Sequence, residues 1–250
     1  MFHYCIKPFW HLILIIFCLK TLFTYPGSFR GYKAQVAAAY SGYDLKTVEL
    51  EQNDKRPHVP AFESADKKFN LADANAIAYY VANDQMRGTT NELKAEVLQW
   101  LNYGSESVIS AVAAWVYPSL SLVESCPAGL KKAQSDLRQV FGCVNDYLKT
   151  RTFLAGERLT LADVSMACDL MMAFQHVADE KFRKPYGNLN RWFATVMNQK
   201  KVKAVVGEVT LCVQAQEFCG KKKIFILFHR LKCIQRIISG PKFQLIFFYI

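Results

Sequence analysis

One stretch, TRTFLAGERLTLADV from Thr150 to Val164, constrains the fold of this chain more than any other. It predicts the end of one helix, a tight turn at Gly156 and the start of a second helix after Thr160. A capping box consists of two hydrogen bonds at the start of a helix. The hydroxyl of the N-cap threonine accepts a hydrogen bond from the backbone N–H of the third helical residue, and the acidic side chain of that third residue accepts one from the backbone N–H of the threonine. Thr160 and Asp163 have this spacing. We therefore predict a structural capping box at Thr160 and Asp163.

From residue 88 to residue 218 the apolar residues follow the spacing of helices alone. A helix is predicted over 130–148, because its apolar residues recur at three and four positions. A long helix is predicted to begin near residue 91 and to kink or end at Pro118. Further helices are predicted after the capping box and across the segments NLNRWFATVMNQ and KVKAVVGEV. Residues 88–218 are therefore expected to form an all-helical domain.

Residues 21–87 instead alternate between the patterns of strands and helices. The segment LFTYPGSFRGYKAQVAAAY predicts a short strand, a Pro-Gly turn and a helix with Ser28 as its N-cap. Strands are predicted across 44–50, 58–62 and 67–71, and Asp73 is predicted to cap a helix that follows it. This order of elements is most of a thioredoxin-like α/β layer. The predicted fold class is therefore α/β plus all-α, with a thioredoxin-like domain packed on a helical one.

The net charge of +10 is concentrated at the two ends of the chain. Residues 219–250 hold seven Lys or Arg and no acid, whereas residues 21–218 hold 22 bases against 21 acids. The central region is thus nearly neutral, and we expect no direct binding of nucleic acid by it.

The two ends carry short apolar runs. The N-terminal extension, residues 1–20, contains an unbroken apolar run of eight residues at 12–19, far short of the ~20 that span a bilayer. It is long enough for a signal peptide, but no Ala precedes Ala34 to supply a cleavage site. The basic and apolar tail, residues 219–250, fits either a membrane-surface segment or sequence unrelated to the folded domains. Membrane contact is not expected.

The eight cysteines contain no C-x-x-C pair and no nearby His at a metal-ligand spacing, so no metal site is predicted. Cys143 and Cys168 fall in apolar helical patterns, and we expect both to be small buried hydrophobic residues in a reducing, cytoplasmic protein. His176 and the Trp192-Phe193 pair are likewise expected to be structural.

Several separated motifs occur together in this chain, in the order LFTYPGSFRGYKA, VPAFE, NAIAYYVAND, WVYPSL, YLKTRTFLAGERLTLAD, NRWF and VKAVVGEVTLC. They closely resemble the glutathione-transferase fold and, more narrowly, the transferase-like domain of the elongation factor 1-gamma family. The resemblance covers residues 21–218.

A transferase of this fold lowers the pKa of the glutathione thiol with a hydroxyl near the N-terminus of its first helix, where the helix dipole also favours an anion. The resemblance implies Tyr25 or Ser28 as this catalytic donor, if the chain is a transferase. Both residues also have structural explanations, Ser28 as an N-cap and Tyr25 as a strand-end aromatic.

The resemblance also implies a glutathione-binding set. Val59 and Pro60 correspond to the residues on either side of a cis peptide bond. In the family, the residue before this proline offers its backbone N–H and C=O to the cysteinyl amide of glutathione. Asp73 and Ala74 stand where the family has an acid and a serine that hold the γ-glutamyl group. Ala74 lacks the hydroxyl, so one of the family's hydrogen-bond donors to glutathione is missing here.

A larger departure lies between Leu50 and Val59. The family has a helix there that forms one wall of the glutathione site, whereas this chain has only eight residues, EQNDKRPH. The thioredoxin-like domain is therefore expected to lack its second helix, and one face of its sheet to be exposed.

The resemblance implies a non-catalytic scaffold of the elongation factor 1 complex, which holds its guanine-nucleotide-exchange subunits, beta and delta, and requires no cofactor. A homodimer is a further implied assembly. Because the family's separate C-terminal domain has no counterpart here, a truncated or variant form is expected. The alternatives are a glutathione transferase that conjugates glutathione or reduces peroxides, and a membrane-tethered interaction protein that uses residues 1–23 or the tail.

Overall fold

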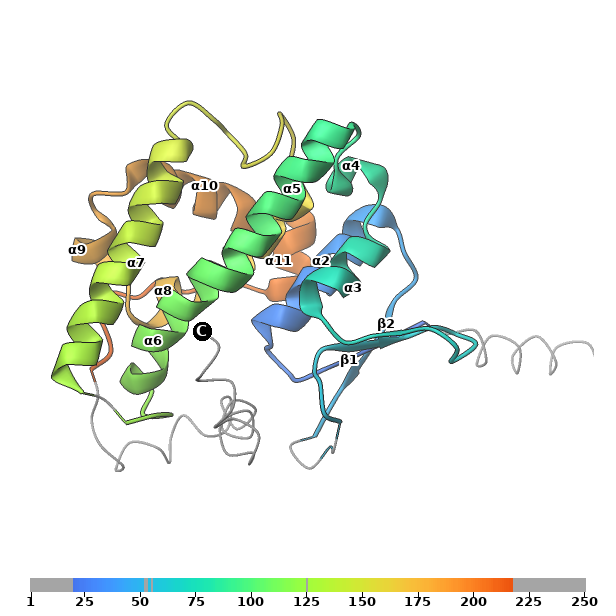
Figure 1. The fold of residues 1–250 in the computed structure, drawn as a ribbon, viewed down its shortest axis with the longest axis horizontal. Coiled ribbons are helices and arrows are strands. Elements are labelled where there is room, and N and C mark those ends of the chain that lie inside the picture. Colours follow the sequence, from blue (N-terminus) through green and yellow to red (C-terminus); the bar gives the residue numbers. More distant parts are fainter. Residues whose placement is uncertain (1–19, 52–53, 55, 125, 218–250) are drawn as a thin grey trace, which may run out of the picture.

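The computed structural model describes residues 20–51, 54, 56–124 and 126–217. The predicted N-terminal apolar run and the basic tail lie outside the described residues. Two parts lie side by side in Figure 1, a small sheet with its covering helices and a larger set of helices.

The sheet has four strands in the order β2-β1-β3-β4. Their bounds are Thr21–Thr24 (β1), Lys46–Glu49 (β2), Ala61–Glu63 (β3) and Asn70–Leu71 (β4). β1 and β2 are parallel, while β3 pairs antiparallel with both β1 and β4. Leu22 and Phe62 are paired across β1 and β3 and are both buried.

Two helices cover one face of this sheet, α2 (Phe29–Ser41) and α3 (Ala74–Val81), followed by the short α4 (Asp84–Arg87). Gly31 allows α2 to approach the end of β1, because a Cβ at this position would lie 2.2 Å from the Thr24 hydroxyl oxygen. A larger residue would push the helix away from the sheet.

The connection between Leu50 and β3 contains no helix among its described residues. Phe23, Val48 and Ala61, which are neighbours in the strand register, are only partly buried. The Arg56 guanidinium lies over the Phe23 ring, 3.4 Å from its centroid. The predicted thioredoxin-like layer is confirmed, and the described residues of this connection contain no second helix.

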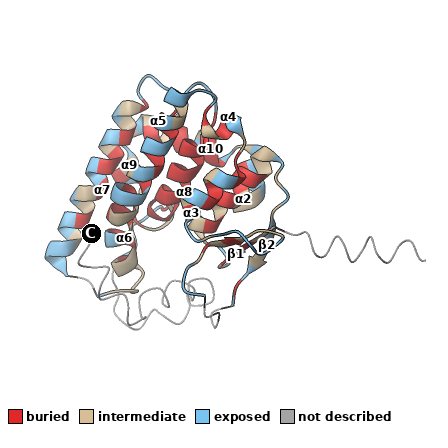
Figure 2. Ribbon diagram, turned by 45° about the vertical axis from the view of Figure 1, so that its right-hand side comes forward, coloured by how far each residue is buried: buried red, intermediate tan, exposed pale blue. Residues whose placement is uncertain are grey.

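The second part is all-helical. Its elements are α5 (Asn91–Tyr103), a π-helical turn (Gly104–Val108), α6 (Ile109–Ser119), α7 (Pro127–Tyr147), α8 (Leu161–His176), α9 (Glu180–Arg183), α10 (Gly187–Met197) and α11 (Lys200–Val206). α8 is the central helix, since every residue from Leu161 to Phe174 is buried (Figure 2). Within the described part of the chain, no helix is both long and apolar enough to cross a membrane.

Two details of the helical part differ from the prediction. The helix predicted from residue 91 onward is interrupted by the π-helical turn, where a Cβ on Gly104 would lie 2.6 Å from Asp169 Oδ2. Cys143 is exposed, whereas Cys168 is buried as predicted. The buried side of α7 includes Val140, Phe141 and Val144, and Cys143 points away from that stripe.

The helical part is organised around the buried carboxylate of Asp163. Asp163 Oδ1 accepts hydrogen bonds from the Leu154 N–H at 2.8 Å and the Trp192 indole N–H at 2.9 Å. Its Oδ2 accepts from the backbone N–H of Thr160 at 3.0 Å and from the Thr160 hydroxyl at 3.2 Å. Thr160 and Asp163 form a capping box at the start of α8. One side chain thus joins α8, α10 and the preceding turn.

We expect Asp163→Ala to lower the free energy of unfolding by about 3 kcal/mol or more, because it leaves buried donors on Leu154, Thr160 and Trp192 without an acceptor. Denaturant unfolding measures this. The matched control, Asp136→Ala, removes an exposed aspartate that pairs with Lys132 on α7 and should change stability by at most about 1 kcal/mol. Equal losses in the two variants would contradict the role of Asp163.

Candidate functional site

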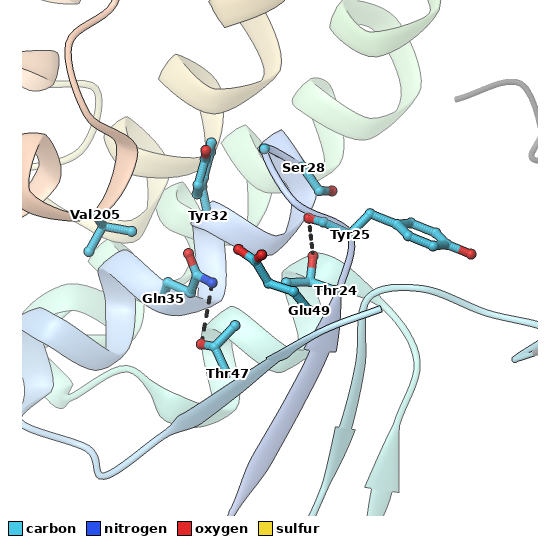
Figure 3. A pocket seen from close by; sticks show the side chains of 9 residues that line it. Thr24, Tyr25, Ser28, Tyr32, Gln35, Thr47, Glu49 and Val205 are labelled. Carbon is cyan, nitrogen blue, oxygen red and sulfur yellow. Dashed lines mark hydrogen bonds between the residues drawn. The ribbon is translucent and has the colours of Figure 1, made fainter. Parts of the chain in front are cut away.

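A pocket of about 390 Å³ lies at the carboxyl ends of the parallel strands β1 and β2, beside the start of α2 (Figure 3). We call it the β1–β2 pocket. Its lining residues are Thr24, Tyr25, Gly27, Ser28, Tyr32, Gln35, Thr47, Glu49 and Val205. The carboxyl ends of parallel strands are a usual position for a ligand site in α/β folds. The pocket includes both predicted catalytic donors, Tyr25 and Ser28.

These two residues differ in how they face the pocket. Ser28 is the N-cap residue of α2, as predicted, but its side chain makes no capping hydrogen bond. Its backbone N–H instead donates to the Tyr25 carbonyl at 3.2 Å. The Tyr25 ring extends away from Gln35, Thr47 and Glu49 in Figure 3.

The four residues predicted to bind glutathione do not line the β1–β2 pocket. The Val59–Pro60 peptide bond is cis. Asp73 is the N-cap of α3, and its Oδ1 accepts the Ala76 N–H at 2.8 Å. Ala74 is buried and offers no hydroxyl. The β1–β2 pocket therefore includes Tyr25 and Ser28 in its lining and does not include the rest of the predicted set.

The charge of the β1–β2 pocket is negative. Glu49 is the one charged side chain in its lining, which contains no Lys or Arg. Burial, together with the nearby Cys168 and Glu49, raises the pKa of Tyr32, so that its hydroxyl stays neutral. The pocket offers no cationic partner to the carboxylates of an anionic tripeptide. Elsewhere among the described residues, no group of three His, Cys, Asp or Glu side chains could hold a metal ion.

A buried ion pair that was not predicted from the sequence connects the two parts of the molecule. Lys33 Nζ on α2 lies 2.7 Å from Asp169 Oδ1 and 2.9 Å from Oδ2 on α8, and both side chains are at most 1% exposed. Asn75 Oδ1 on α3 accepts from Lys33 Nζ at 3.0 Å and from the Ser165 hydroxyl at 3.1 Å. Burial raises the pKa of Asp169, and the Lys33 charge opposes this shift. A lysine on the apolar face of the predicted helix was the signal that could have revealed the pair.

His176 lies at the end of α8, against the chain that follows α11. Burial lowers its pKa, while a hydrogen bond with the Gln216 side chain partly opposes this. The Gln216 N–H also donates to the His176 carbonyl at 2.9 Å. These contacts hold the end of the helical part in place. Trp192 and Phe193, which were predicted to be structural, are buried in the core of the helical part.

Comparison with known proteins places this geometry in a family. The N-terminal domain model of glutathione S-transferase matches residues 20–83, and the C-terminal domain model matches residues 112–200. Elongation factor 1-gamma of Artemia salina is 43% identical over 213 residues, which cover 80% of this chain and 49% of that protein. The chain belongs to the elongation factor 1-gamma family. The human family member is 38% identical over 217 residues, or 81% of this chain and 49% of its own length. The chain thus spans about half the length of these curated relatives.

Solved structures show the same fold. The transferase-like domain of elongation factor 1-gamma from Saccharomyces cerevisiae matches with a TM-score of 0.71 at 19% identity, over 80% of this chain and 98% of that one. The glutathione transferase URE2P6 from Phanerochaete chrysosporium, solved with oxidized glutathione, matches with a TM-score of 0.68 at 19% identity, over 75% of this chain and 94% of that one. The predicted transferase-like architecture is therefore confirmed for this member of the elongation factor 1-gamma family.

We expect Lys33→Met to destabilise the protein by about 3–5 kcal/mol, because it leaves the Asp169 charge buried without a partner. The double variant Lys33→Met/Asp169→Leu removes both charges and should recover part of that loss. Denaturant unfolding compares both with Lys132→Met, which breaks an exposed i,i+4 pair and should cost at most about 1 kcal/mol. A single Lys33 variant as stable as the Lys132 variant would contradict this assignment.

The lowered pKa of His176 gives a stability that depends on pH. The ordinary pKa of histidine is 6.5. As the pH drops below this value, the His176 imidazole takes up a proton more readily in the unfolded chain than in the folded protein, so the free energy of unfolding falls. We expect His176→Gln to reduce this loss between pH 7 and pH 5. Unfolding curves at several pH values provide the measurement. Identical pH dependence in wild type and His176→Gln would count against the proposed shift.

Proposed function

We propose that this chain is a non-catalytic scaffold subunit of the cytoplasmic elongation factor 1 complex, in which it anchors the guanine-nucleotide-exchange subunits beta and delta. The observation that carries the proposal is the 43% identity to the Artemia salina elongation factor 1-gamma over 80% of the chain. A second copy of the chain is a further proposed partner. The proposal requires a rigid domain with exposed docking faces and no bound cofactor.

The contacts inside the molecule support rigidity. Asp163 connects α8 to α10 and to the turn before the capping box. The buried pair of Lys33 and Asp169 fixes α2 of the small part against α8 of the helical part. The two parts can therefore present one continuous surface to a partner.

The arrangement of the predicted glutathione residues supports a non-catalytic role. Tyr25 and Ser28 line a pocket whose charged side chain is an acid, whereas Val59, Pro60, Asp73 and Ala74 lie outside that lining. The Asp73 carboxylate is engaged in capping α3. The connection that would supply the second helix of the family is short and has no helix among its described residues.

The second candidate function is a glutathione transferase, for conjugation or peroxide reduction. It is favoured by the shared fold with a transferase solved with oxidized glutathione and by the cis Val59–Pro60 bond. Its test is retention on immobilised glutathione together with turnover that falls in Tyr25→Phe or Ser28→Ala. Retention and turnover with this dependence would favour the enzyme over the scaffold.

We expect the chain to co-purify with a tagged beta exchange subunit and, in a separate experiment, with a tagged delta subunit. A full-length relative from Artemia salina serves as the positive control, and the tag alone as the negative control. Association of this chain at the salt concentration at which the relative binds would support the scaffold. Loss of association under those same conditions would contradict it.

A further inference from the structure

The β1–β2 pocket gathers hydrogen-bond acceptors around one negative charge. Glu49 ends β2, and Gln35 reaches the pocket from α2 (Figure 3). The Gln35 Nε2 donates to the Thr47 hydroxyl oxygen at 3.3 Å, so the donor end of the amide is engaged and its Oε1 remains as an acceptor. The hydroxyls of Thr24 and Thr47 add further oxygens.

The charge of Glu49 is not neutralised within the described part of the molecule. None of its salt bridges involves Glu49, and the pocket lining has no Lys or Arg. Glu49 is exposed, so its unpaired carboxylate is open to solvent. Beside oxygen acceptors, this carboxylate favours a ligand that brings both a positive charge and several N–H donors.

We propose that the β1–β2 pocket binds a primary ammonium group, as carried by a lysine side chain or by a polyamine. An ammonium has three donors, which match the Glu49 carboxylate, Gln35 Oε1 and a threonine hydroxyl. The pocket volume of about 390 Å³ also has room for the carbon chain that carries the ammonium group. Val205 supplies an aliphatic wall from α11 against which such a chain can pack.

The start of α2 is the one feature of the pocket that favours an anion, because the N-terminus of a helix carries partial positive charge. Here the Glu49 carboxylate lines the same pocket as the N-cap residue Ser28. A negative group of the protein itself therefore already lies in this pocket, and a second anion would be repelled by it. The proposed site is separate from the proposed scaffold function and does not depend on it.

The test is isothermal titration of the full chain at low salt with two probes, cadaverine and Nα-acetyl-lysine amide. We expect saturable binding that weakens as salt is added. Glu49→Gln should weaken binding at least about tenfold, because a hydrogen bond to a charged group is lost. The matched control is Glu157→Gln, which neutralises an exposed acid outside the pocket and should leave binding unchanged. Binding of both probes indicates a lysine side chain as a source, whereas binding of cadaverine alone indicates a polyamine.

A second variant tests the acceptor geometry without removing the charge. Gln35→Glu adds a carboxylate to the pocket and should tighten binding of cadaverine several-fold, while N,N′-diacetylcadaverine, which has no ammonium, should not bind. Thermal unfolding of each variant confirms that it is folded. No saturable binding of either probe, or equal affinities in Glu49→Gln and Glu157→Gln, would overturn the proposal.

Discussion

The fold depends on a single buried carboxylate that accepts hydrogen bonds from three places in the chain. Asp163 is fully buried and binds the backbone of Leu154 and Thr160 and the indole of Trp192. The segment before α8 has no regular secondary structure, so its backbone N–H groups need acceptors of another kind. The side chain of Asp163 supplies them, which allows an irregular turn to be buried against the most buried helix of the molecule.

A second buried polar cluster ties the small α/β part to the helical part. Lys33 and Asn75 come from α2 and α3, and Ser165 and Asp169 come from α8. Gly104 leaves room for the Asp169 carboxylate at the π-helical turn. Buried charges are tolerated where they are paired and hydrogen-bonded. Because each part supplies one charge, their relative placement is fixed by electrostatics as well as by apolar packing.

The two parts of a transferase are thus retained, while Val59, Pro60, Asp73 and Ala74 lie outside the lining of the β1–β2 pocket. The helix that would complete one wall is missing from the described connection before β3, and the pocket at the ends of β1 and β2 carries a carboxylate. Nothing in the packing of α8 or in its ties to α2 requires a bound ligand.

The sequence predicted the elements with strong periodicity and the caps with clear local chemistry. The Thr160 cap and the Asp73 cap are both present, because each depends on neighbouring residues alone. The Lys33–Asp169 pair joins residues 136 positions apart. The position of Lys33 on the apolar face of its helix points to a buried partner, but no local pattern identifies that partner as Asp169. Ser28 occupies the predicted cap position without the capping bond, since the backbone there turns toward Tyr25.

The most direct test of this account is amide hydrogen exchange at Leu154 and Thr160. If the Asp163 carboxylate holds the turn as described, these two amides should exchange only through global unfolding, as slowly as the core amides of α8. Exchange at the rate of an exposed loop would contradict the central place of Asp163 in this fold.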